Sequence, residues 1–199
     1  MRYWHDVSGD HKHVGVAAIA RSVWYAATLR YMRGGGVECY YPEDDRPSPS
    51  RRRLHAMVAY GFGLCLVSTI AAAVLQDGFG DQPPYAWISL PVLAGTLGGV
   101  GMVVGCAGLL LLKARSSEVT SIAAMTVKDY GLLVALGFLA LSGLATLLTR
   151  STSAFGLVLL IHLSAVVLAF ASAPYSKIVH VVFRFAALVR DNAERATAD

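Results

Sequence analysis

The chain has 199 residues, of which 55% are hydrophobic and only 15% are charged, and its mean hydropathy is +0.53. A soluble domain carries about 25% charged residues, so this composition argues against a soluble bundle of buried helices. The net charge of +4 comes with no basic run interleaved with a nucleic-acid motif, so no nucleic acid is expected among the partners.

The N-terminal segment is polar and basic before any long apolar run begins. Its first residues, "MRYWHDVSGDHKHV", lack the apolar stretch of a cleavable signal peptide. Residues 14–33 have a helical period, with three arginines on an apolar and aromatic background. This pattern predicts a cytosolic helix that lies at a membrane interface or docks a partner. Three glycines at 34–36 end it, and "YPEDDRPSPS" at 41–50 predicts a loop.

Four long runs without Asp, Glu, Lys or Arg occupy the rest of the chain. A helix needs about 20 apolar residues to cross the hydrocarbon core of a bilayer. The sequence therefore predicts an all-α integral membrane protein, a four-helix transmembrane bundle with the N-terminal interfacial helix and a C-terminal helical tail. The expected spans are roughly 54–75, 88–112, 130–149 and 154–173. The expected domains are a lead segment at 1–53, a membrane domain at 54–192 and a disordered tail at 193–199.

Basic residues are distributed very unequally between the two ends of these spans. Sixteen Lys and Arg residues lie in the N-terminal segment, in the 113–129 connection or in the C-terminal tail, whereas Arg150 alone lies on the other side. Cytoplasmic loops are enriched in Lys and Arg. We therefore expect both termini in the cytoplasm and a multi-pass protein of the bacterial inner membrane.

Small residues and cysteines offer less specific signals. Glycines stand four residues apart at 95 and 99 and again at 101 and 105, which favours close helix packing or, alternatively, leaves room for a flat cofactor. The three cysteines, at 39, 65 and 106, show no CxxC spacing. We expect no disulfide framework, and no zinc or iron–sulfur site made by this chain alone.

Two histidines stand in the last hydrophobic stretch. His162 and His180 are eighteen residues apart, so an unbroken helix would place both on one face, about 27 Å apart, although Pro174 would kink it. Ionisable side chains within spans are costly and usually functional. A neutral imidazole is also the common axial ligand of haem iron. The alternatives are a histidine hydrogen-bonded to a neighbouring helix, or one at the membrane edge.

A bis-histidine site follows from comparing depths. His55 begins the first span and His180 ends the last, so both lie at the cytoplasmic edge and could ligate one haem b. The basic side chains near them would neutralise the haem propionates. These side chains are Arg53, Lys177 and Arg184.

A second haem is less well supported by the sequence. Cys65 matches the depth of His162, but a cysteine ligates iron well only as a thiolate. Met102 lies roughly 9 Å too deep. We therefore expect one bis-histidine haem per chain, with His162 either hydrogen-bonded or supporting a five-coordinate second haem.

These motifs resemble known families. "IHL" followed by "PYSKIVH" is similar to the last span of the respiratory nitrate reductase gamma subunit. The resemblance is closer to the membrane region of a related family, tricarballylate (citrate) utilization protein B, and covers about residues 29–190. It rests on "LRYMRGGGVECYYPEDDRPSPSRRRLH", "YGFGLC", "SLPVLAGTLGGVG" and "PYSKIVHVVFRFAALVR".

The resemblance implies a cytochrome b-type electron-transfer subunit rather than a stand-alone enzyme. Such a subunit would reoxidise a flavoprotein dehydrogenase and pass electrons toward quinone, with His55, His162 and His180 matching the family's histidines. The family's ferredoxin-like, cysteine-rich region lies upstream of the matched stretch, so iron–sulfur clusters are expected only in a partner or in that region.

Two other classes of function stay open. One is a haem-free membrane anchor or assembly subunit whose histidines only pack between helices. The other is a transporter subunit with His162 in a proton path, but no acidic residue lies within a span, and Asp129 stands only at the edge of the third.

Overall fold

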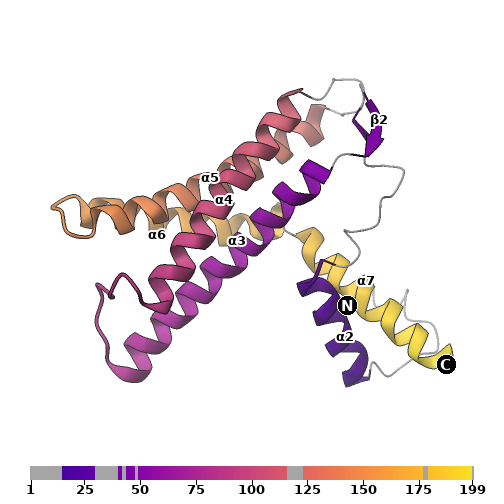
Figure 1. Cartoon of the computed structure of the whole chain (residues 1–199), viewed down its shortest axis with the longest axis horizontal. Coiled ribbons are helices and arrows are strands. Elements are labelled where there is room, and N and C mark those ends of the chain that lie inside the picture. The colour runs from indigo at the N-terminus through magenta and orange to yellow at the C-terminus, as the bar shows by residue number, and fades with distance from the viewer. Residues whose placement is uncertain are drawn as a thin grey trace. The chain divides into compact units, whose positions relative to one another are not determined.

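The computed structural model describes residues 15–29, 40–41, 44–47, 49–115, 123–176 and 179–198 (Figure 1). The chain divides into two compact units. The larger unit is Gly36–Lys177, and the smaller unit joins Met1–Gly35 to Ile178–Asp199.

Four long helices make up most of the larger unit. Each is long and apolar enough to cross a membrane, and the four coincide with the expected spans to within a few residues. Pro49 opens the first of them, where its missing N–H costs no helical hydrogen bond. The helices are α3 (Pro49–Ala73), continued by a π-helical turn at Val74–Gly78, then α4 (Leu90–Arg115), α5 (Ala123–Thr149) and α6 (Phe155–Ser172).

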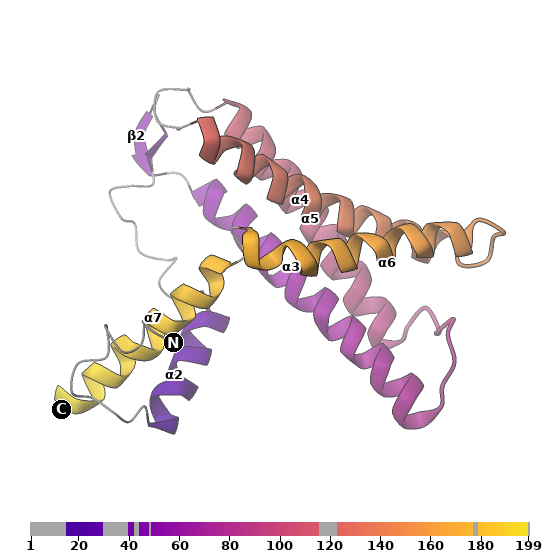
Figure 2. The ribbon, with the colours of Figure 1, turned by 180° about the vertical axis from the view of Figure 1, so that it is seen from behind.

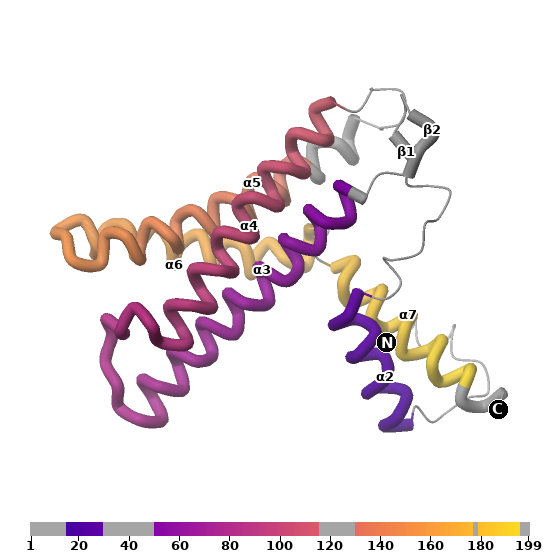
Figure 3. Tube along the Cα trace, in the orientation of Figure 1, coloured from indigo at the N-terminus to yellow at the C-terminus, as the bar shows by residue number. Residues whose placement is uncertain are grey.

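Successive helices of the larger unit are neighbours in space. The main packing contacts join α3 to α4, α4 to α5 and α5 to α6 (Figures 2 and 3). The interior is correspondingly narrow: Met102 and Cys106 on α4 are 1% exposed, whereas α6 has no buried residue. Large apolar side chains such as Leu168 and Phe170 therefore cover the outside, where contact with water would be unfavourable.

The end of α5 is tied to the connection between α3 and α4. The guanidinium carbon of Arg150 lies 3.5 Å from the centroid of the Trp87 ring, and its Nη1 donates to the Tyr85 carbonyl at 2.9 Å. Tyr85 in turn donates its hydroxyl to the carbonyl of Ala72 on α3, at 2.9 Å. The cation predicted alone on this side thus connects three segments of the larger unit.

The helix that carries His162 does not continue to His180. After α6 ends at Ser172, a 3-10 turn covers Ala173–Tyr175, Ser176 adopts an extended conformation, and a new helix begins at Val179. The fourth span therefore ends within a residue of its expected end at 173, and the unbroken helix that would place both histidines on one face is not formed. Pro174 has no N–H to donate and its ring blocks the preceding turn, so it breaks the helix instead of only kinking it.

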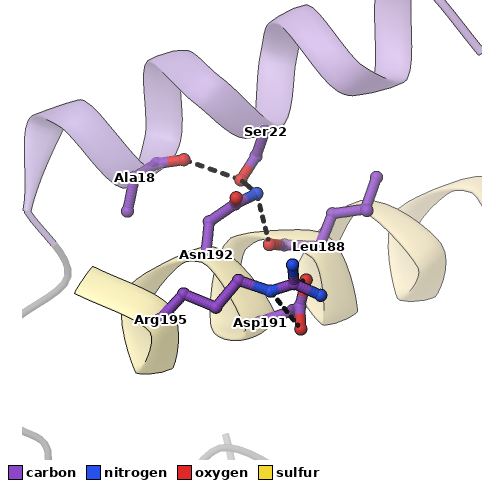
Figure 4. A network of polar contacts seen from close by, with 6 residues as sticks. All are labelled: Ala18, Ser22, Leu188, Asp191, Asn192 and Arg195. Carbon is purple, nitrogen blue, oxygen red and sulfur yellow. Dashed lines mark hydrogen bonds and ion pairs between the residues drawn. The ribbon is translucent and has the colours of Figure 1, made fainter. Parts of the chain in front are cut away.

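The smaller unit is a pair of packed helices, α2 (Val16–Ala27) and α7 (Val179–Ala198). Both were expected as helices, the first within residues 14–33 and the second as the C-terminal tail. Ser22 and Asn192 are buried where the two helices meet (Figure 4). Residues 193–198, predicted as disordered, are helical, and Arg195 pairs with Asp191 one turn earlier at 3.1 Å.

A short hairpin interrupts the otherwise helical chain. Strand β1 (Tyr40–Tyr41) pairs antiparallel with β2 (Asp44–Pro47), and Tyr41 stands opposite Asp44. The loop expected at 41–50 is therefore partly a two-stranded turn, which is the one departure from all-α structure among the described residues.

Candidate functional site

His162 contacts a polar side chain of the neighbouring helix. It lies on α6, and its Nδ1 is 3.0 Å from the Oγ of Ser142 on α5. The connection between these helices is centred near residue 152, so 142 and 162 are equally far from the turn. An antiparallel helix pair places such residues at the same level.

The hydroxyl of Ser142 has only one hydrogen, which fixes the direction of this bond. That hydrogen is donated to the carbonyl of Leu139, at 3.0 Å, because a carbonyl can only accept. When both bonds form together, Ser142 Oγ accepts from His162, and the ring proton is then on Nδ1. The other ring nitrogen, Nε2, is left with its lone pair.

Gly143 provides the space in which the His162 ring lies. A Cβ at position 143 would be 3.0 Å from Cε1 of the ring, 3.5 Å from Nδ1 and 3.6 Å from Nε2. The ring edge that carries Cε1 therefore packs against the backbone of α5 at Gly143, where there is no side chain. Alanine at this position would crowd the ring.

This arrangement fits the chemistry of a haem ligand. Histidines that bind metals usually donate one ring N–H to an oxygen acceptor and coordinate through the other nitrogen. His162 has that acceptor in Ser142, and Nε2 is the nitrogen that remains. The residues present thus fit an axial imidazole, although a histidine that only packs between helices would make the same bond.

The other predicted site residues belong to different parts of the chain. His55 is half-buried near the start of α3, and Arg53 beside it is exposed. His180 and Arg184 are exposed, one turn apart on α7 of the smaller unit. Lys177 lies outside the described residues. The pairing of His55 with His180 joins the two units and stays a prediction.

The two candidate partners for a second haem face each other. Cys65 Sγ lies 3.9 Å from the Met102 sulfur, and Met102 is 1% exposed. A Cβ at Gly61 would come within 2.8 Å of Met102 Cγ, so this side chain is enclosed between α3 and α4. Both sulfurs are thus used in packing these two helices.

The glycines of α4 also serve helix packing, which was one of the two interpretations left open. A Cβ at Gly95 would be 2.9 Å from the Ser68 Oγ, and one at Gly105 would be 2.9 Å from the Leu54 carbonyl. Their backbones therefore approach α3 directly. Helix association in an apolar solvent depends on such close approach of small residues.

Sequence reasoning missed Ser142 and Gly143. The signal was available: a Ser-Gly pair in the middle of the third apolar run, placed symmetrically with His162 about a short turn. Finding it required reading the two spans as one antiparallel hairpin instead of separately.

Comparison with known proteins gives one family. The family described as Citrate utilization protein B matches residues 1–199. The chain is 37% identical over 190 residues to citrate utilization protein B of Escherichia coli, covering 96% of this chain and 50% of that relative. The chain thus spans about half the length of the curated relative. No solved structure matches it.

Proposed function

This chain belongs to the citrate utilization protein B family, and we propose that it is a membrane-embedded, cytochrome b-type electron-transfer subunit. It takes electrons released by a flavoprotein dehydrogenase in tricarballylate or citrate catabolism and passes them toward the quinone pool. Membership of the family supports the link with tricarboxylate use. The electron-transfer role rests on the histidines.

The observation that carries this proposal is the environment of His162. An imidazole in the interior of an apolar helix is costly and is retained where it has a function. Here its Nδ1 is bonded to Ser142 and its Cε1 edge lies on Gly143, which leaves Nε2 as the coordinating atom. Haem supplies one-electron chemistry when it is bound at such a ligand.

The remaining predicted residues would complete the cofactor sites. His55 and His180 supply two imidazoles for a haem b at the cytoplasmic edge of the membrane. The propionates there are neutralised by Arg53, Lys177 and Arg184, through charge-assisted hydrogen bonds. This is also the side from which a soluble electron donor would approach.

The membrane location rests on the four apolar helices and their exposed side chains. Their mean hydropathy values lie between 1.9 and 2.3, and at most 28% of any span is buried within the chain. Lipid is the environment that such surfaces require. We place the chain in the bacterial inner membrane, with both termini in the cytoplasm.

The proposed electron path also needs a donor that delivers electrons to these helices. A ferredoxin-like donor could transfer electrons one at a time from a flavin, which releases two, to a haem, which accepts one. It would belong to a partner or to a region such as the half of the Escherichia coli relative that lies outside the alignment.

Optical spectroscopy of the purified protein tests the proposal. We expect a b-type α-band in the reduced-minus-oxidised spectrum, and less haem per chain in His55→Ala and His180→Ala. Ser172→Ala is a matched control, because this exposed hydroxyl bonds a carbonyl of its own helix. A folded, haem-supplemented protein without an α-band would contradict the proposal.

A haem-free membrane anchor is the second candidate function. The Ser142 bond also favours it, because that bond alone satisfies the His162 ring nitrogen that carries the proton. In that case the protein is colourless, and His55→Ala and His180→Ala leave its co-purification with the dehydrogenase unchanged.

A further inference from the structure

We infer that Ser142 and Gly143 are positioning residues that hold His162 as the Nδ1-protonated tautomer, with Nε2 available to haem iron. The inference rests on the proposed function and assigns roles to two residues of α5 that bind no cofactor themselves. It also removes the choice between a hydrogen-bonded His162 and a ligating one, because the two roles use different ring nitrogens.

The tautomer follows from the chain of hydrogen bonds on α5. The Leu139 carbonyl takes the Ser142 hydrogen at 3.0 Å, and Ser142 Oγ accepts from His162 Nδ1 at 3.0 Å. Without Ser142, the side-chain acceptor is lost, and the Leu139 backbone, which also hydrogen-bonds the His162 ring, is the acceptor that stays near it. Hydrogen bonds of this kind orient a ligating imidazole and raise its basicity, and losing one typically costs 10–100-fold in metal affinity.

Gly143 fixes the position of the ring by a different physical effect. Glycine in a helix interior is less favourable than alanine, so alanine at 143 would by itself strengthen α5. The added Cβ would, however, stand 3.0 Å from His162 Cε1, closer than ordinary van der Waals contact. The ring would have to move, and Nε2 would move with it.

Two matched pairs of variants separate positioning from general destabilisation. Ser142→Ala removes the acceptor, and Ser142→Thr keeps a hydroxyl. Ser172→Ala is its control, since both serines bond a carbonyl three residues earlier on their own helix. Gly143→Ala crowds the ring, whereas Gly156→Ala on α6 is its control, because nothing lies within 4 Å of a Cβ at 156.

The measurements are haem per chain, the reduction midpoint potential and the spin state by EPR, on the full chain in detergent. In Ser142→Ala we expect 10–100-fold weaker retention of the haem that His162→Ala abolishes. Its midpoint potential should become more positive, because a less basic imidazole stabilises the ferric state less. Ser142→Thr should restore both values, Gly143→Ala should weaken retention, and the two controls should match the wild type.

The outcomes distinguish this inference from the proposed function. A wild type without haem overturns both. Two other results overturn the positioning roles alone. In the first, His162→Ala keeps its haem with unchanged potential and spin state. In the second, His162→Ala loses haem, but Ser142→Ala and Gly143→Ala behave like the wild type. If Gly143→Ala does not accumulate, the comparison of Ser142→Ala with Ser142→Thr is decisive. Equal haem retention and equal midpoint potential in those two variants refute the inference.

Discussion

Asn192 and Ser22, 170 positions apart in the sequence, are joined by a buried hydrogen bond of 3.0 Å between α7 and α2 (Figure 4). Asn192 donates its other amide hydrogen to the Leu188 carbonyl, at 3.0 Å. Ser22 in turn donates to the Ala18 carbonyl, at 2.7 Å. The hydrogen bond can therefore form in only one alignment of α2 along α7. A buried polar pair of this kind specifies how two helices align.

Breaking this pair on one side should destabilise the smaller unit. Ser22→Ala leaves one amide hydrogen of the buried Asn192 without its acceptor, which typically costs about 1–3 kcal/mol. The double variant Ser22→Ala/Asn192→Leu removes both polar groups and should recover most of this loss. Hydrogen exchange at the backbone amides of α2 and α7 measures the effect in the full chain.

An exposed ion pair on α7 provides the control for that experiment. Arg195 pairs with Asp191, but the two side chains are 63% and 42% exposed. Surface pairs contribute about 0–1 kcal/mol, so Arg195→Gln should leave the exchange rates of both helices nearly unchanged. Equal losses in Ser22→Ala and Arg195→Gln would show that the buried pair has no special role.

The contact between α3 and α4 should be highly sensitive to added volume at Gly98. A Cβ there would lie 2.6 Å from the Gly61 carbonyl and 2.9 Å from the Cys65 nitrogen, so the two backbones must separate. Overpacking of this kind costs about 1–3 kcal/mol. We expect Gly98→Ala to lower the unfolding temperature in detergent, with Gly156→Ala as the control that keeps or raises it.

The sequence predicted most of this fold because helices that are apolar enough to span a membrane are recognised by length and composition. Charge-free runs located all four long helices, since a charged residue within lipid is costly wherever it stands. At Pro174 the sequence predicted a kink, whereas the helix breaks there. The choice between a kink and a break depends on local backbone geometry. The sequence also did not indicate Ser142, whose role depends on which residue of the next helix lies opposite.

Depth comparisons from sequence had a second limit. They placed Cys65 level with His162, but depth carries no information about the direction in which a side chain points around its helix. In the structure, Cys65 is directed toward Met102. Packing between α3 and α4, which no single span reveals, decides that direction.

Neither sulfur between α3 and α4 should act as a haem ligand. We expect Cys65→Ser and Met102→Leu to leave the haem content, α-band and EPR signals at wild-type values. Met102→Leu conserves volume and should cost less than about 1.5 kcal/mol. Met102→Ala empties a fully buried position and should cost about 2–5 kcal/mol, again without changing the spectrum of the protein that remains folded. A new high-spin signal in Met102→Leu would instead identify a lost axial ligand.

Arg150 should stabilise the connection between α3 and α4 through geometry as well as charge. Its guanidinium stacks on Trp87 and bonds the Tyr85 carbonyl. Lysine keeps the charge but lacks the planar group that stacks on an aromatic ring, so Arg150→Lys should expose this connection to protease nearly as much as Arg150→Gln does. Protection equal to that of the wild type in Arg150→Lys would show that the positive charge alone is sufficient.

The distribution of basic residues predicts the orientation of the four spans. Sixteen Lys and Arg residues stand on one side and Arg150 on the other, and cells retain such basic segments in the cytoplasm. A reporter fused after Asp199 should therefore give a cytoplasmic signal, and one inserted within 77–86 an extracytoplasmic signal. Because Arg150 is the one cation that this orientation places outside, Arg150→Gln should strengthen the asymmetry and leave both signals as they are. The reverse pattern of signals would refute the orientation, and would also place His55 and His180 on the side of the membrane away from a cytosolic electron donor.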